Sequence, residues 1–175
     1  MKTPTLEWLP AITGGIVLNL GCGLRPMKGA INHDRTKHHE RIDVTHDLDV
    51  MPWFPLHDLP TFDTVVAYDV VEHVKDCLGF VNEIADIIHP GGLLIMRGAA
   101  WDNPSSYIDT THRHFLHEES FDFFDRSTRL GGHYGTFYVD SLGRKLTEWK
   151  MISVNRVNPD PRYGIGDLEY HLKKR

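Results

Sequence analysis

Two glycines spaced two residues apart end a short apolar run near the start of the chain. Residues 17–23 read Val-Leu-Asn-Leu-Gly-Cys-Gly, which is the pattern of a strand that ends in a tight turn. Because glycine has no Cβ and tolerates positive φ, a ligand can approach the main chain closely at Gly21 and Gly23. The turn therefore predicts a binding site for a small polar ligand.

Phosphate-bearing cofactors fit this turn poorly. A dinucleotide-binding turn needs a third glycine for close packing of a helix, and Pro26 occupies that place. A Walker A loop needs Gly-Lys followed by Ser or Thr, and no such sequence follows Gly23. Neither of these phosphate-binding turns is predicted.

Histidine is unusually frequent, with 12 residues in 175, and this frequency raises the question of a metal site. Only His112, His114 and His117 lie close together in the sequence. None of their intervals is the i, i+4 pair of a zincin helix, and the polar residues around them indicate an irregular loop. We therefore predict no metal ligand from the sequence.

The elements that position these residues follow from the apolar pattern. Short continuous apolar runs predict buried strands at residues 16–20, 64–68 and 93–96. Between the last two, apolar residues spaced by three or four predict an amphipathic helix over 74–88, stopped by His89-Pro90-Gly91. A strand, a helix and a strand in this order predict a right-handed parallel βαβ unit.

The last third of the chain has a different pattern. Residues 134–139 and 146–154 are rich in β-branched and aromatic side chains, and 140–143 can form a turn, which predicts an antiparallel hairpin at one sheet edge. A long loop is expected over 98–111, followed by a short helix that includes residues 121–124.

Composition limits the class of protein. With 41% hydrophobic and 25% charged residues, the 175 residues fit one globular domain. A net charge of −5 and a pI near 6.1 argue against nucleic acid or an anionic membrane as partner. Two cysteines without a CxxC spacing predict reduced thiols. No run suited to a membrane span or signal peptide is seen, so a soluble, cytoplasmic protein is expected.

The segment 17–23 resembles the first motif of the class I methyltransferases that use S-adenosylmethionine. Further segments resemble that family in the right order. They are 31–34 (second strand with a terminal acid), 44–48 (an Asp-Leu segment), 62–74 (fourth strand with Glu-His-Val) and 89–96 (glycine turn and fifth strand). The resemblance implies an α/β fold with a Rossmann-like, doubly wound, mostly parallel sheet in three layers. It also implies one methyltransferase-like domain over 1–175.

The resemblance assigns the cofactor site residue by residue. Backbone amides of Gly21, Cys22 and Gly23 would receive the methionine moiety, with Arg25 as counter-ion of its carboxylate. Asp34 would accept hydrogen bonds from both ribose hydroxyls. The other interpretation of Asp34 is a surface acid.

The adenine and the remaining cofactor contacts are assigned in the same way. Asp47 would accept from the adenine amino group while Leu48 packs on the ring, although a turn acid and a core leucine explain the pair equally well. Asn19 and Asp69, in the matched first and fourth strand segments, are assigned to the same cofactor site. This chain departs from the family pattern after Gly23, because residues 24–30 are too few for a crossover helix.

Methyl transfer from a sulfonium is an in-line displacement with a good leaving group. Positioning contributes most of the catalysis, on the order of 7–11 kcal/mol, and a base is needed only if the acceptor must lose a proton. The candidate bases are His73 at the end of the fourth strand, and His112 and His114 in the loop after the fifth; Asp109 is a candidate to orient one of them. A helix-start histidine is the structural alternative for His73.

The segment 109–121 resembles a stretch that follows the fifth strand in some small family members, and it is expected to close over the acceptor. Trp101, Tyr107 and Phe115 would exclude water there, or else pack the loop down. Three functions remain open. The first is a methyltransferase with a small or exposed acceptor, the second a cofactor-binding partner subunit without activity, and the third an NAD-dependent oxidoreductase. Pro26 and the early position of Asp34 disfavour the third.

Overall fold

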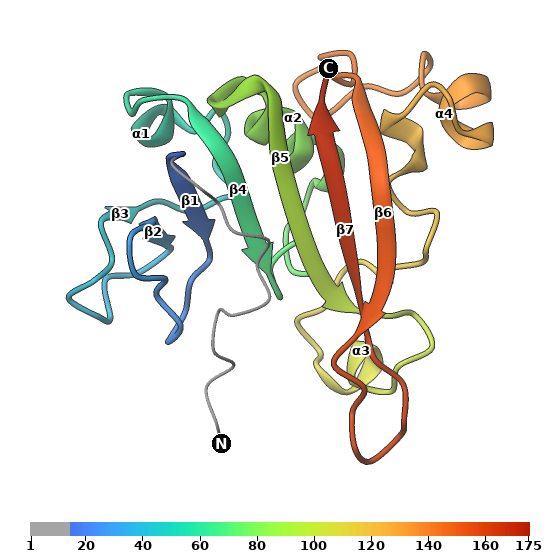
Figure 1. Cartoon of the computed structure of the whole chain (residues 1–175), viewed down its shortest axis with the longest axis horizontal. Coiled ribbons are helices and arrows are strands. Elements are labelled where there is room, and N and C mark those ends of the chain that lie inside the picture. The colour runs from blue at the N-terminus through green and yellow to red at the C-terminus, as the bar shows by residue number, and fades with distance from the viewer. Residues whose placement is uncertain (1–14) are drawn as a thin grey trace.

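A single seven-stranded sheet organises the protein (Figure 1). The computed structural model describes residues 15–175, and its strand order is β3-β2-β1-β4-β5-β7-β6. The strands are β1 (Val17–Leu20), β2 (Ile31–Asp34), β3 (Val44–Thr45), β4 (Phe62–Tyr68), β5 (Ile88–Ala99), β6 (Trp149–Val157) and β7 (Asp167–Lys174). Strands β1 to β5 pair in parallel, and β7 pairs antiparallel with β5 and β6. The predicted fold class is confirmed.

The predicted βαβ unit consists of β4, α2 (Cys77–Ile87) and β5. Helix α2 begins three residues later than the predicted Val74, because the Asp76 carboxylate accepts the N–H of Gly79 at 2.9 Å and caps the helix there. Strand β5 starts directly after the helix, at Ile88. The helix therefore ends just before His89-Pro90-Gly91, as predicted, but these three residues belong to strand β5.

The C-terminal hairpin is real, but one of its two predicted strands is wrong. Residues 134–139 form no strand: Tyr134 ends α4 (Arg129–Tyr134), and Val139 makes only an isolated bridge to Lys145. Local hydrogen bonds decide this region, because Thr128 caps α4 and Asp140 accepts backbone N–H groups of its own turn. The hairpin instead pairs β6 with β7.

Strand β7 was missed, although its sequence carries the signal of a strand. Leu168, Tyr170 and Leu172 are fully buried, while the residues between them face the other side of the sheet. This period of two is the mark of a strand.

The remaining helices are short. They are α1 (Phe54–His57), α3 (Ser105–Ile108), which interrupts the predicted loop, and the 3-10 helix η2 (Asp122–Phe124) at the place of the predicted short helix. No helix within residues 15–175 is long and apolar enough to cross a membrane.

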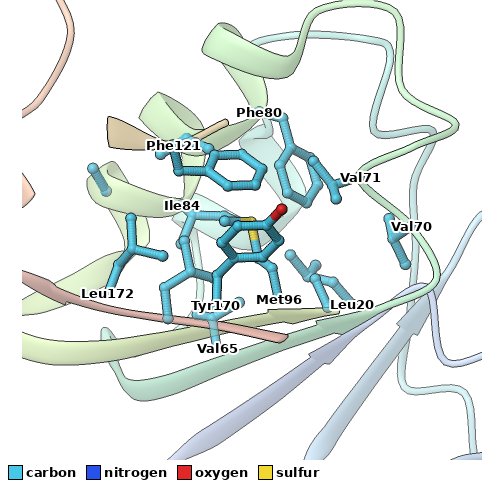
Figure 2. Packing of buried hydrophobic residues seen from close by; sticks show 14 of the residues in the cluster. Leu20, Val65, Val70, Val71, Phe80, Ile84, Met96, Phe121, Tyr170 and Leu172 are labelled. Atoms are coloured by element: carbon cyan, nitrogen blue, oxygen red, sulfur yellow. The ribbon is translucent and has the colours of Figure 1, made fainter. Parts of the chain in front are cut away.

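The hydrophobic core covers one face of the sheet (Figure 2). Strands β4, β5 and β7 contribute Val65, Met96 and Tyr170, and α2 packs Phe80 and Ile84 onto them. Leu56 of α1 and Phe124 of η2 belong to the same cluster. Within residues 15–175, α1, α2 and η2 therefore pack on the same face of the sheet.

Candidate active site

The carboxyl end of β1 is the topological switch point of the sheet. From β1 the neighbouring strands are β2 on one side and β4 on the other, and open α/β sheets bind ligands at such a point. The turn after β1 has positive φ at Gly21 (59°) and Gly23 (53°). A Cβ on Gly21 would lie 2.5 Å from Val70 Cγ2, whereas nothing lies within 4 Å of one on Gly23. The Gly23 side of the turn is therefore open.

Asp34 lies directly against this turn. Its Oδ2 accepts the N–H of Gly23 at 2.8 Å, and its side chain is 17% exposed. Its other oxygen, Oδ1, accepts the Thr36 N–H at 3.4 Å and lies 4.0 Å from His38 Nδ1. His38, which the sequence analysis did not single out, completes the group, since its Nε2 contacts the Gly23 carbonyl at 2.9 Å. One carboxylate oxygen thus binds the turn, and the other contacts Thr36 and His38.

The connection between β1 and β2 has no crossover helix and is instead ordered by the side chains of two buried asparagines, Asn19 and Asn32. No helix lies between β1 and β2, as predicted, and the loop 24–30 is tied down by side chains. Asn32 Oδ1 accepts from the Met27 N–H at 2.7 Å and from the Asn19 amide at 2.9 Å. The Asn32 amide donates to the carbonyls of Met27 and Ala30. Asn19, a predicted cofactor residue, is 3% exposed and its amide serves this loop.

Cys22 belongs to the turn through its backbone. Its N–H donates to the His33 carbonyl at 2.9 Å, which joins the turn to β2. The thiol is buried, and burial followed by the nearby Asp34 charge raises its pKa to about 11. The sulfur is therefore protonated at neutral pH and unsuited to act as a nucleophile.

Charged side chains gather where β1, β4 and β5 end. The Asp69 carboxylate lies 3.2 Å from Arg97 and 3.6 Å from Arg25. Asp69 has a φ of 57°, an uncommon conformation for a residue other than glycine, and its N–H donates to the Arg97 carbonyl. Arg25 is well exposed, so this end of the sheet offers a guanidinium and a carboxylate side by side.

The predicted adenine residues lie after β3. Asp47 Oδ1 accepts the N–H of Asp49 at 3.0 Å, as in a turn closed by an aspartate. Leu48 is 9% exposed and belongs to the core cluster, and its carbonyl accepts from the Trp53 indole. The pair is thus held in place by local contacts.

Two of the three predicted bases come together. The rings of His73 and His112 lie 4.7 Å apart, centre to centre, in an edge-to-face arrangement. Burial and the neighbouring His112 lower the pKa of His73 below its ordinary value. His114 lies outside this pair, and its Nε2 contacts the Val74 carbonyl at 2.9 Å.

Asp109 orients His73 through a threonine. Thr111 Oγ1 donates to Asp109 Oδ1 at 2.6 Å, and His73 Nδ1 contacts the same hydroxyl at 2.9 Å. Asp109 also lies 3.8 Å from His112 Nε2. The predicted orienting carboxylate is therefore placed beside both histidines.

Glu72 is the group at this site that the sequence analysis left without a role. It is 2% exposed, and burial raises its pKa to about 8. Its carbonyl accepts the N–H groups of Arg113 and His114, so it also anchors the loop after β5. A carboxylate next to a histidine at a strand end was the signal in the sequence.

The loop after β5 exposes aromatic rings. Tyr107 and Phe115 stack with ring centres 4.8 Å apart, yet both remain more than half exposed, at 59% and 51%. Trp101 packs beside His117. The rings therefore pack against neighbours in pairs and still present apolar surface.

Comparison with known proteins agrees with this geometry. A family model described as a methyltransferase domain matches residues 18–96, which span β1 to most of β5. The solved structure of an S-adenosylmethionine-dependent methyltransferase, a possible histamine N-methyltransferase from Thermotoga maritima, is similar. It has 16% identity and a TM-score of 0.60, with 94% of this chain and 84% of that chain covered. No curated protein matches the chain in sequence.

Two further structures share the fold. A putative methyltransferase of Haloferax volcanii, solved in complex with the Trm112 activator, has 14% identity and a TM-score of 0.61 over 96% of this chain and 86% of that chain. A 1,6-didemethyltoxoflavin-N1-methyltransferase of Burkholderia thailandensis, solved with bound 1,6-didemethyltoxoflavin and S-adenosylhomocysteine, has 14% identity and a TM-score of 0.57. There, 91% of this chain and 71% of that chain are covered.

The strand order, with its antiparallel C-terminal pair, is that of the class I methyltransferase fold. Residues 18–96 match the methyltransferase-domain family model, and the chain shares the fold of solved S-adenosylmethionine-dependent methyltransferases. The NAD-dependent alternative has no support from these findings.

Proposed function

We propose that the protein transfers the methyl group of S-adenosylmethionine to a small or exposed acceptor, and that the turn Gly21–Gly23 and Asp34 hold the cofactor. The observation that carries this proposal is the 2.8 Å hydrogen bond from the Gly23 N–H to Asp34 Oδ2. It sets the two predicted contacts, the turn and the ribose acid, side by side and leaves Asp34 Oδ1 to accept from a ribose hydroxyl.

The methionine end of the cofactor is a zwitterion, and the charges at the switch point complement it. The Arg25 guanidinium suits the carboxylate, and Asp69, 3.6 Å away, suits the ammonium group. Backbone N–H groups of the open turn add donors for the carboxylate. Asp47 and Leu48 are proposed for the adenine, and Asn19 and Cys22 act by holding the turn.

The acceptor is proposed to bind at the carboxyl ends of β4 and β5, under the loop that carries the exposed Tyr107 and Phe115. Alignment of acceptor, methyl group and sulfur supplies most of the rate enhancement, because the sulfonium is already a good leaving group. For an acceptor that must lose a proton, His73 or His112 is the proposed base, since both stand at this edge.

The first test is cofactor binding by isothermal titration calorimetry with S-adenosylhomocysteine. Asp34→Ala is expected to weaken binding by about 1–3 kcal/mol, the effect of losing a charged hydrogen-bond partner. Asp58→Ala is the matched control, since Asp58 is exposed at the end of α1. An unchanged dissociation constant for Asp34→Ala would remove Asp34 from the site.

A second variant separates the ribose contact from the support of the turn. Asp34→Asn retains one oxygen for the Gly23 N–H but replaces the other by an amide, which cannot accept. Binding is expected to weaken in this variant too. Full affinity in Asp34→Asn would mean that Asp34 acts only through the turn.

The alternative function is a cofactor-binding partner subunit without activity. The similar Haloferax volcanii protein, a putative methyltransferase, was itself solved in complex with a partner, the Trm112 methyltransferase activator. Incubation with labelled S-adenosylmethionine and a broad panel of small acceptors distinguishes the two functions. Cofactor consumption supports the transferase, whereas tight binding without any consumption supports the partner subunit.

A further inference from the structure

Glu72, His73 and His112 form a cluster of metal-binding type that the sequence did not reveal. Each offers one ligand atom, and these atoms all lie within 4.8 Å of one another. The residues come from two places, because Glu72 and His73 follow β4 and His112 lies in the loop after β5. The fold thus assembles a set that is separated by almost forty positions, which is why the spacing of histidines alone predicted no site.

The hydrogen bonds of the two histidines engage Nδ1 of each ring, while His112 Nε2 lies 3.8 Å from the Asp109 carboxylate. Thr111 gives its only hydroxyl proton to Asp109, so His73 Nδ1 must donate to Thr111 Oγ1. His112 Nδ1 lies 3.2 Å from the Ser106 carbonyl, which can only accept. Both rings are therefore held with Nδ1 protonated and an Nε2 lone pair, which is the arrangement that outer partners impose on metal-binding histidines.

The carboxylate supplies an independent observation. Glu72 is 2% exposed, and its Oε2 has no hydrogen-bond partner among the residues that the structure describes. A buried carboxylate oxygen without a partner is costly, and a cation beside it would remove that cost. The residue that carries this oxygen, Glu72, belongs to the same cluster as His73 and His112.

We propose that Glu72, His73 and His112 bind a divalent transition-metal ion. Two imidazoles and one carboxylate form the set that leaves coordination positions open, and imidazole favours zinc, cobalt or iron over magnesium and calcium. Metal–nitrogen distances are about 2.0–2.1 Å, so the side chains must draw together from their present separations when the ion binds.

The role of the ion rests on the proposed function. The cluster stands at the strand ends where the acceptor is proposed to bind, and an open position there would bind an acceptor oxygen or nitrogen and favour its deprotonated form. A metal-bound Nε2 cannot also take a proton, so in the metal-bound protein the ion replaces the histidines as the group that activates the acceptor.

The experiment measures metal binding directly, without activity. The full chain is titrated with Co²⁺, followed by its visible absorption, and Zn²⁺ is added to displace it. One Co²⁺ per chain is expected, with Mg²⁺ failing to compete. Glu72→Gln, His73→Gln and His112→Gln are each expected to weaken binding by at least about a hundredfold, beyond what loss of an outer partner costs.

His114→Gln is the matched control, because His114 lies in the same loop but bonds to the Val74 carbonyl outside the cluster. It should bind Co²⁺ like the unchanged protein. Equal affinity in all variants, or no Co²⁺ binding by the unchanged protein at millimolar concentration, would overturn the metal site.

Binding of S-adenosylhomocysteine by each variant keeps the two proposals apart. A variant that binds it normally is folded, so its loss of Co²⁺ reports on the ligand itself; if Glu72→Gln fails this check, the two histidine variants decide. Failure of the unchanged protein to bind S-adenosylhomocysteine contradicts the proposed function, whereas failure to bind Co²⁺ contradicts only the metal site.

Discussion

Polar side chains hold together the N-terminal half of the sheet, β1 to β3, whereas hydrophobic burial holds the C-terminal half, β5, β7 and β6. In the first half, Asn19 and Asn32 are buried and bond to backbone groups of the loop between β1 and β2. In the second half, Leu94, Met96 and Tyr170 are fully buried in the main cluster. The strands differ in the same sense, since β1 to β3 are short and β5 to β7 are long.

The difference separates the binding site from the part that stabilises the fold. A hydrogen bond contributes about 0.5–1.5 kcal/mol net, while burial of a large apolar side chain contributes about 1.5–3 kcal/mol. Elements that rely on few apolar contacts open locally more easily, and ligand-binding segments commonly belong to them. We therefore expect the cofactor to stabilise the N-terminal half more than the C-terminal half.

The largest effect is expected from the C-terminal half. Tyr170→Ala should lower the free energy of unfolding by about 3–5 kcal/mol, because the ring packs edge-to-face on Phe121 and leaves a cavity (Figure 2). Urea denaturation measures this. Tyr170→Phe is the control, since it loses only the hydrogen bond to the His117 carbonyl and should cost about 1 kcal/mol. Equal losses in both variants would contradict a role for ring packing.

The second effect is a pH dependence that arises in the N-terminal half. His33 of β2 is fully buried, and burial lowers its pKa from 6.5 to about 4. Because the folded pKa lies below the unfolded one, this stability is present above pH 6.5 and is lost as the pH falls toward 4. The loss amounts to about 3 kcal/mol at 1.36 kcal/mol per pKa unit.

Urea denaturation at several pH values tests this, with His33→Gln as the variant that cannot titrate. As the pH falls, the unfolding free energy of the unchanged protein should decrease relative to that of the His33→Gln variant. A difference that is constant with pH would show that His33 does not carry the effect, and His89→Gln, which alters an exposed histidine, serves as control.

The third effect is local. Asn32→Ala removes the acceptor of the Met27 N–H and the donors to Met27 and Ala30, so the loop 24–30 should lose about 2 kcal/mol of local stability. Amide hydrogen exchange should accelerate in that loop and not in β5. Asn155→Ala is the control, because the Asn155 amide contacts only Ser153 at an exposed position. Equal exchange in the loop would mean that the asparagine is not what orders it.

The smallest effect concerns the glycine turn after β1. Gly21→Ala and Gly23→Ala both place a Cβ at positive φ, which costs about 1 kcal/mol. Only at Gly21 does the new atom also meet Val70 of the core. Thermal denaturation should therefore give a lower melting temperature for Gly21→Ala than for Gly23→Ala. The reverse order would show that the turn is not packed against the core.

Much of the fold is readable from local sequence. The apolar runs located β1, β4 and β5, because buried parallel strands are continuous in hydrophobicity, and the spacing in α2 reported its buried face. The hairpin prediction was wrong for one of its two strands. In residues 134–139, the hydrogen bonds of Asp140 and the Thr128 cap stabilise a turn and a helix in spite of the β-propensity of the side chains. Strand propensity is decided by neighbours as much as by the residue itself.

By itself, the sequence determined the positions of β1, β4 and β5, the glycine turn, the shortened connection after it and the acid at the end of β2, because each depends on residues close together in the chain. Only the tertiary structure decided that Asn32 replaces a helix, that Asp34 binds the turn, and that Glu72 and His73 meet His112. Those contacts join separate segments, and their geometry is set by how the sheet brings strand ends together.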